Sequence, residues 1–356
     1  MNISIFGAGP CGLSLAIHLL QRDNKVLLHT DANHQRTFSK LSCNSSISSI
    51  GEIDGTFLLN VTQSFSEALL FARILIVAVP TNAHEALLAK IENTNHDLTR
   101  HIIIAIPSNF FPLLSHRRIK ARAILGVATS PFTSKAQNGK LLVKSIKKVL
   151  PISGLPATLG HSLCEEIARI FPQTLDWYPN CLALDLACIG AIMHVVPTLL
   201  NVGWIETAKG DLGLYADCMT DSVVDIMTAL DQDRLEIGRR FDCELEPVLQ
   251  MMNKYYGTSY RTLREFVQNS KPHNMTRWAP DSMEHRVITQ DIPCSFVPWF
   301  QLGQKVDFYS RLMDTFIFLG SRINKDDYVT NGRNLRKLGI EALTKEEILK
   351  VVLQAH

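Results

Sequence analysis

The N-terminal segment constrains the fold more than any other part of the chain. An apolar run, 3–6, leads into Gly7-Ala-Gly-Pro-Cys-Gly12, and a helical apolar pattern begins directly at Leu13. A strand, a Gly-x-Gly-x-x-Gly turn and a helix in this order are what a dinucleotide-binding βαβ unit requires. The start of such a helix offers free N–H groups and a positive dipole end to a pyrophosphate.

Each residue of the turn has its own expected role. Gly7 permits the tight turn, Gly9 lets the backbone approach the pyrophosphate, and Gly12 lets the helix lie close to the strand. Pro10 suits the first helical turn, where its missing N–H costs little. We therefore predict a cofactor site that includes Gly7, Gly9, Pro10, Cys11 and Gly12. The alternative is a plain strand–turn–helix whose glycines serve packing only.

Further apolar runs in the first half predict a Rossmann-type α/β domain, a parallel sheet with helices on both faces. Strands are expected at 25–30, 74–79, 102–106 and 123–128, and helices at 13–21 and 83–91. Continuous apolar runs are typical of buried parallel strands. Because cofactors bind at the carboxyl edge of such a sheet, Val79 and Pro80 are predicted to contact the cofactor as well.

The end of the second strand bears on the choice between NAD and NADP. In NAD-binding units an acidic residue there holds the ribose 2′-OH. The corresponding position is Thr30, and His34, Arg36 and Lys40 follow as cations that suit a 2′-phosphate. We therefore predict Thr30 and Arg36 as cofactor contacts and favour NADP. A shift of one residue would make Asp31 the ribose ligand and favour NAD.

Beyond about residue 172, helical patterns replace strands. They cover 182–193, 197–206, 222–241 and 310–322, and Thr344 and Glu347 form a capping box before a last helix. We predict a boundary in the range 150–180, with a Rossmann domain at 1–175 and an all-α domain at 176–356. The segment 182–205 is apolar enough to suggest a membrane span, but Asp185 and His194 favour a buried helix pair.

Composition narrows the classes of partner. Hydrophobic residues make up 46% and charged residues 20% of the chain, and the net charge is +2. Neither a nucleic-acid nor a membrane partner is therefore expected, although an oligomer is compatible with the chain. The eight cysteines contain no Cys-x-x-Cys pair, so no metal or redox site is predicted, and they favour a reducing, cytoplasmic location.

Three residues in the second half are candidates for catalysis. His194 lies in an apolar helical pattern, where a lone histidine is more often a core residue than a catalytic one. A hydride-transferring enzyme, however, needs a group that exchanges a proton with its substrate, and imidazole suits that task. Asp291 is a candidate to orient His194, and Arg286 a candidate to clamp a substrate carboxylate. The alternative for Arg286 and Asp291 is a surface ion pair.

The chain resembles the opine dehydrogenase family of the octopine/nopaline type. Besides the N-terminal turn, three segments carry the resemblance: His194-x-x-Pro-x-x-Leu-Asn201-x-Gly203, His285-Arg286-x-x-x-x-Asp291-x-Pro293 and Gly332-Arg-x-Leu-x-x-Leu-Gly339. The resemblance implies a Rossmann domain, an all-helical domain and an active site in the cleft between them. It further implies that NAD(P)H reduces the imine formed from an amino acid, or a related amine, and a 2-oxo acid.

By the same resemblance, His194 is the acid/base, Asp291 its partner, Arg286 a ligand of the substrate carboxylate and Asn201 a substrate-binding residue. Gln290 departs from the family pattern, because many relatives carry an acid there. Two other functions stay open at this point. One is a 2-oxo acid or ketopantoate-type reductase without an amine substrate, and the other is a non-catalytic NAD(P)-sensing protein.

Overall fold

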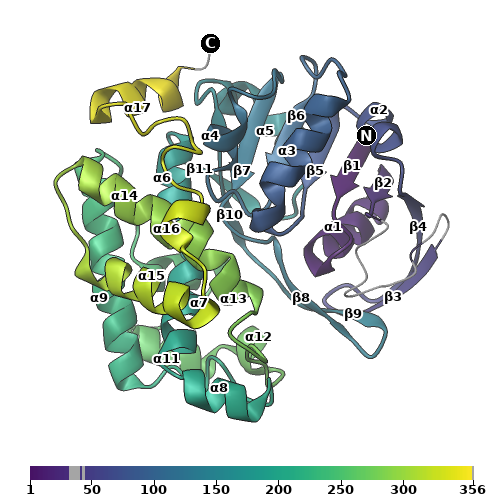
Figure 1. Cartoon of the computed structure of the whole chain (residues 1–356). Helices are drawn as coiled ribbons and strands as arrows, with labels where there is room; N and C mark the ends of the chain where they lie inside the picture. The colour runs from purple at the N-terminus through teal and green to yellow at the C-terminus, as the bar shows by residue number, and fades with distance from the viewer. Residues whose placement is uncertain (32–40, 42–44, 355–356) are drawn as a thin grey trace. The chain divides into compact units, whose positions relative to one another are not determined.

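The glycine turn joins a buried strand to a helix in the computed structural model, which describes residues 1–31, 41 and 45–354 (Figure 1). The chain divides into two units: the first comprises Met1–Cys181 together with Gln354, and the second comprises Leu182–Leu353. The first unit holds the sheet, and the second is helical.

The strands of the first unit are β1 (Asn2–Phe6), β2 (Lys25–His29), β3 (Ser45–Gly51), β4 (Gly55–Thr62), β5 (Ile74–Val77), β6 (Ile102–Ala105), β7 (Ala123–Val127), β8 (Phe132–Gln137), β9 (Lys140–Ile146), β10 (Val149–Leu155) and β11 (Thr174–Trp177). Its helices are α1 (Pro10–Leu20), α2 (Phe65–Phe71), a 3₁₀ turn (Thr81–Ala83), α3 (His84–Asn93), α4 (Phe111–Ser115) and α5 (Leu159–Ala168).

Six neighbouring strands form the parallel part of the sheet. Their order is β4-β2-β1-β5-β6-β7, and every adjacent pair among them is parallel. The strand order changes direction between β1 and β5, which is the switch point where doubly wound sheets bind nucleotides. The apolar runs are buried on both faces because helices flank the sheet (Figure 1). The predicted Rossmann-type fold is therefore confirmed, although β2 ends at His29 and not at Thr30.

Six strands were not predicted from the sequence. At one edge of the sheet, β10 pairs antiparallel with β7 and parallel with β11. At the other edge, β3 pairs antiparallel with β4 and parallel with β9, which forms a hairpin with β8. These strands are less continuously apolar than the central ones; β3, for example, reads Ser-Ser-Ile-Ser-Ser-Ile-Gly. Ser134 of β8 donates to the Pro10 carbonyl at 3.2 Å and accepts from Ser14 at 2.9 Å. The hairpin therefore packs against the start of α1.

The helices of the second unit are α6 (Cys181–Leu186), α7 (Gly190–Leu199), α8 (Val202–Ala208), α9 (Asp221–Arg240), α10 (Val248–Tyr256), α11 (Leu263–Asn269), α12 (Lys271–Asn274), α13 (Arg286–Thr289), a π-helix (Ile292–Phe296), α14 (Val297–Lys305), α15 (Arg311–Asn324), α16 (Tyr328–Asn331) and α17 (Lys345–Leu353). The capping box before α17 forms as predicted, because Thr344 and Glu347 exchange backbone-to-side-chain hydrogen bonds of 2.8 and 3.3 Å.

The apolar segment before residue 200 folds differently from the prediction. One continuous helix was expected over 182–193, but α6 ends at Leu186 and α7 begins at Gly190. The Asp185 carbonyl accepts from the Trp299 indole at 3.1 Å, and the Leu186 carbonyl accepts from Arg234 at 3.0 Å. These tertiary bonds occupy carbonyls that a continuing helix would use. The stretch Cys181–Leu199 has the length and hydropathy of a membrane span, yet 89% of the tested window is buried within the protein.

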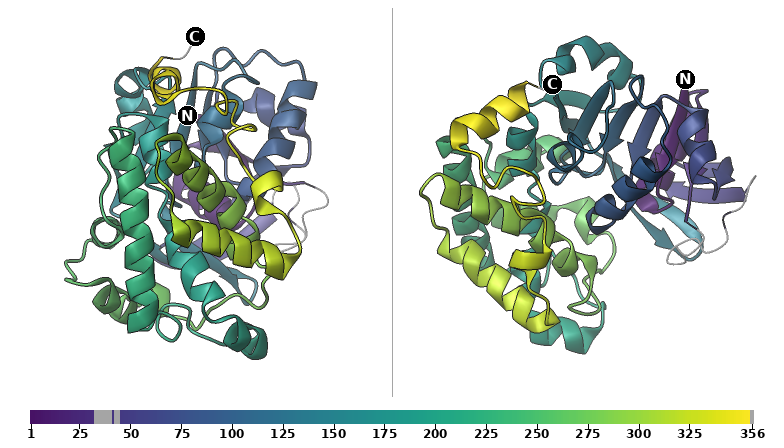
Figure 2. Two further views of the ribbon diagram at one scale, coloured as in Figure 1. Left: turned by 60° about the vertical axis from the view of Figure 1, so that its left-hand side comes forward. Right: turned by 45° about the horizontal axis from the view of Figure 1, so that its top comes forward.

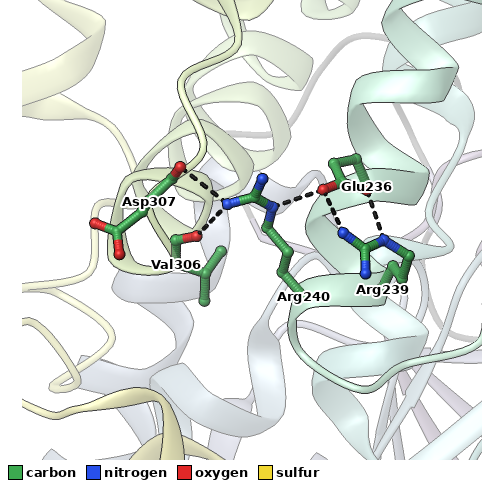
Figure 3. A network of polar contacts seen from close by, with 5 residues as sticks. All are labelled: Glu236, Arg239, Arg240, Val306 and Asp307. Carbon is green, nitrogen blue, oxygen red and sulfur yellow. Dashed lines mark hydrogen bonds and ion pairs between the residues drawn. The ribbon is translucent and has the colours of Figure 1, made fainter.

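The long helix α9 packs against α7, α11 and α14, and the left view of Figure 2 shows it at full length. Its C-terminal end is tied to the segment after α14 by a polar network (Figure 3). Arg240 donates to the carbonyls of Val306 and Asp307 at 2.8 and 2.9 Å, and Glu236 accepts from Arg239 and Arg240. The two guanidinium groups hold the pKa of Glu236 low, at about 2. This network fixes one end of the unit.

Candidate active site

The three glycines of the turn differ in how closely other atoms approach them. A Cβ at Gly12 would lie 2.0 Å from the Gly7 carbonyl oxygen, and one at Gly7, whose φ is +118°, would lie 2.5 Å from the Ala78 oxygen. These two glycines are therefore required by the protein itself. A Cβ at Gly9, in contrast, would meet no atom within 4 Å. The space beside Gly9 is free, and this is where the motif places a pyrophosphate.

The neighbouring residues complete this edge of the sheet. Pro10 occupies the first turn of α1, and Gly9 is the N-cap with no side-chain cap bond. The α1 N-terminus therefore lacks a capping side chain that would compete with an anion. Val79 and Pro80 follow β5, where the Ala78 N–H donates to Phe6 at 2.8 Å. The structure thus brings the predicted Val79 next to the turn, because Gly7 lies against Ala78 and the Val79 nitrogen, whereas the contact of Pro80 with a cofactor stays a prediction.

The end of β2 places Thr30 and Asp31 in different surroundings. The Thr30 N–H donates to the Thr62 carbonyl at 3.1 Å, which extends the pairing of β2 with β4 by one residue. Asp31 forms an ion pair with Lys90 of α3, and both side chains are about half exposed. Arg36, together with His34 and Lys40, lies outside the described residues.

A buried lysine near the glycine turn was missed by the sequence reasoning. Lys147, between β9 and β10, is only 8% exposed and donates to the Thr129 hydroxyl just after β7. Burial lowers its pKa to about 7, and nearby Cys11 of the turn acts in the opposite direction. A desolvated lysine is strongly coupled to any anion that approaches it. Its only sequence signal was a lysine pair, Lys147-Lys148, before an apolar strand.

In the helical unit, His194 and Asp291 meet across 97 residues of sequence. The His194 Nδ1 lies 2.8 Å from the Asp291 Oδ2, and the two side chains are 33% and 11% exposed. His194 lies on α7, and Asp291 immediately precedes the π-helix Ile292–Phe296. Short π-helical segments are frequent at functional sites. The Gln290 amide donates to the second Asp291 oxygen at 3.2 Å, so both carboxylate oxygens are bonded.

The small residue beneath the histidine supports this geometry. A Cβ placed at Gly190 would lie 3.7 Å from the His194 Cε1, so the ring stands one helical turn above Gly190 and in contact distance of it. α7 also contains Pro197, which has no N–H to donate and precedes the helix end at Leu199. The His194 ring is thus supported on one side by its own helix and on the other by Asp291.

Arg286 and Asn201 have different environments. Arg286 is the first residue of α13 and is exposed. Asn201 uses its amide group structurally, donating to the Pro197 and Cys218 carbonyls at 2.7 and 3.1 Å. These bonds close the turn between α7 and α8. Only the Asn201 side-chain oxygen is left for a substrate, so its predicted substrate-binding role stays a prediction.

His285 is a second residue for which the sequence reasoning assigned no role. It is the N-cap of α13, and its Nδ1 accepts the Val287 N–H at 3.3 Å. Burial lowers its pKa, helped by Arg286 and His194, while Asp281 and Asp291 act to raise it. The ring is therefore neutral at neutral pH. The described residues contain no group of three or more metal-ligating side chains.

Comparison with known proteins matches a nucleotide-binding domain to the first unit and a dehydrogenase helical domain to the second. Residues 2–176 match the model for the NAD-dependent glycerol-3-phosphate dehydrogenase N-terminus. Residues 177–324 match the NAD/NADP octopine/nopaline dehydrogenase α-helical domain. The first unit is a Rossmann-type nucleotide unit, and the second is a helical unit with a partly buried His–Asp pair. This combination is that of a two-domain NAD(P)-dependent dehydrogenase.

Individual relatives indicate which kind of dehydrogenase the chain resembles. The chain is 26% identical to the opine dehydrogenase of Arthrobacter sp. (strain 1C), covering 98% of each chain. It is 25% identical to D-nopaline dehydrogenase of Agrobacterium vitis, covering 83% of this chain and 79% of the relative. The solved structure of octopine dehydrogenase with NADH and agmatine superimposes with a TM-score of 0.75 at 16% identity, covering 100% and 99% of the chains. Together these findings support the opine dehydrogenase family for this chain.

Proposed function

We propose that the protein catalyses the NAD(P)H-dependent condensation of an amino acid, or a related amine, with a 2-oxo acid to an N-(carboxyalkyl)amino acid. The observation that carries this proposal is the His194–Asp291 pair, which stands in a helical unit of the octopine/nopaline dehydrogenase type. Amine and 2-oxo acid lose water to form an imine. The cofactor, when bound at the Gly7–Gly12 turn, supplies the hydride that adds to the imine carbon.

His194 moves the proton in this reaction. Because a carboxylate only accepts hydrogen bonds, the Nδ1 that faces Asp291 carries a hydrogen, and Nε2 is the nitrogen left for the substrate. Protonated Nε2 gives its proton to the reacting nitrogen or oxygen as the hydride arrives. Asp291 orients the ring and stabilises the imidazolium that forms in the reverse direction. Gln290 keeps Asp291 in place through its second oxygen.

Arg286 binds the substrate carboxylate in this proposal. Its guanidinium is exposed on the first turn of α13, so it is available for a bidentate pair with an anion. Asn201 offers one side-chain oxygen near the end of α7 for an amine or hydroxyl group. NADP is the proposed preferred cofactor, because Asp31 is engaged by Lys90 and Thr30 carries no charge to repel a 2′-phosphate. The substrates are small molecules of the cytoplasm.

An assay at 340 nm tests the reaction. NADPH or NADH is supplied with pooled 2-oxo acids, with and without pooled amino acids, and oxidation is expected only when both pools are present. Oxidation with 2-oxo acids alone would indicate a ketopantoate-type reductase. Tight coenzyme binding without any oxidation would indicate an NAD(P)-sensing protein.

The role of His194 is tested by His194→Ala. We expect turnover to fall by at least about 100-fold, while the Kd for coenzyme is unchanged. Arg239→Ala is the matched control, because Arg239 lies in the polar network at the far end of α9 and its side chain is 71% exposed. Full turnover in the histidine variant would remove His194 from the mechanism.

A further inference from the structure

His285 has a fixed hydrogen-bonding pattern. Its Nδ1 accepts the backbone N–H of Val287, so the lone pair on that nitrogen is used and the ring hydrogen of the neutral form lies on Nε2. The bond belongs to the N-cap of α13, where free N–H groups need acceptors. The structure therefore assigns one tautomer to this histidine, a neutral ring with Nε2–H.

The orientation of the ring is fixed as well. The Trp278 ring meets the His285 ring edge-on, with centroids 5.6 Å apart and planes at 65°. Trp278 is itself held by its backbone, because its carbonyl accepts from the Leu214 N–H at 2.9 Å and it forms a β-bridge with Gly213. A ring held at Nδ1 and along its edge loses little further freedom when it binds a ligand.

His285 caps α13, and α13 packs against α7, the helix that carries His194. The electrostatic neighbours of His285 are Arg286, Asp281, His194 and Asp291. A cationic His285 would compete with His194 for Asp291 and would oppose the imidazolium form of His194. A neutral donor avoids both effects, because it adds an N–H without adding charge.

We propose that His285 is a specificity-determining residue that donates its Nε2–H to the carboxylate of the 2-oxo acid, beside the guanidinium of Arg286. This inference rests on the proposed function. A carboxylate has about four lone-pair sites, and a bidentate arginine uses only two of them. The two adjacent residues, one cationic and one neutral, supply the donors that a 2-oxo acid carboxylate needs. A neutral alcohol or amide at this position of the substrate would bind Arg286 poorly.

Two substitutions distinguish the contribution of the Nε2–H donor of His285 from that of its planar ring. His285→Phe retains a planar ring against Trp278 and removes the donor, whereas His285→Gln retains an N–H donor. We expect His285→Phe to raise the Kd of pyruvate or 2-oxoglutarate about tenfold, measured through the fluorescence of bound NADH. His285→Gln is expected to stay within about threefold of the wild type. The KM for the amine and the Kd for NADH are expected to be unchanged in both variants.

The outcomes distinguish this inference from the proposed function. A wild type that binds 2-oxo acids but condenses none of them would overturn the function and leave the role of His285 standing. Equal Kd values for the wild type and His285→Phe, equal losses in both variants, or no binding of either acid would overturn the role of His285. Nitrogen-15 spectra give a readout independent of activity. They are expected to show protonated Nε2 and bare Nδ1 for His285 at pH 7, and the opposite tautomer would contradict the inference.

Discussion

Gly9 offers a sharp test of the nucleotide site, because the protein itself places nothing beside it. Its backbone has φ −77° and ψ 175°, which alanine adopts freely, and a Cβ there meets no atom within 4 Å. Gly9→Ala is therefore expected to change the free energy of unfolding by less than about 0.5 kcal/mol. The added methyl group, however, occupies the space through which a pyrophosphate approaches the start of α1.

The loss of binding can be estimated from the hydrogen bonds involved. A phosphate displaced by a methyl group loses one charged hydrogen bond to the backbone N–H groups, which is worth about 1.5–3 kcal/mol. This corresponds to a Kd for NADPH or NADH that is about 10- to 100-fold higher. Fluorescence titration measures the Kd, and urea unfolding measures the stability of the same sample.

Two other glycines serve as controls. Gly12→Ala is expected to destabilise the protein by about 1–3 kcal/mol, because its Cβ would lie 2.0 Å from the backbone oxygen of Gly7. Gly203→Ala, in α8, meets nothing within 4 Å and is expected to leave coenzyme binding unchanged and to raise stability by at most about 1 kcal/mol. If Gly9→Ala binds coenzyme as tightly as the wild type does, the turn does not carry the pyrophosphate and the reasoning is refuted.

Two further predictions concern buried or partly buried charge. Asp291→Asn is expected to lower kcat about 10- to 100-fold, because it removes a charge-assisted bond of 2.8 Å to His194, and an unchanged kcat would show that the carboxylate is dispensable. Lys147→Met is expected to stabilise the protein at pH 7 by at most about 5 kcal/mol. The native pKa of Lys147 is about 7, well below its ordinary value of 10.5, so between these pH values the unfolded chain binds a proton that the native state lacks. Stability of the wild type should therefore rise with pH across this window in urea unfolding. The free energy of unfolding of the methionine variant should rise less with pH. Identical pH slopes for the wild type and the variant would contradict the burial of the ammonium group.

The core of the nucleotide unit could be predicted from the sequence because its signals are local. A parallel strand buried on both faces reads as an apolar run, and the 74–77 and 102–105 segments are such runs. The outer strands gave no such signal, because they are not continuous apolar runs: β3 reads Ser-Ser-Ile-Ser-Ser-Ile-Gly and β8 reads Phe-Thr-Ser-Lys-Ala-Gln. The break between α6 and α7 was also hidden, since Trp299 and Arg234, more than forty residues away in sequence, bind the carbonyls at that point.

The sequence by itself determined the glycine turn, the parallel strands, the helical second half and the family motifs that name His194, Arg286 and Asp291. Only the tertiary structure decided which side chains meet. It brought Asp291 to His194 across 97 residues, buried Lys147 beside Thr129 and fixed the ring of His285 against Trp278. The physical reason is that secondary structure and tight turns depend on neighbours in the chain. Protonation, tautomer and hydrogen-bond partner depend on burial and on groups that only folding brings together.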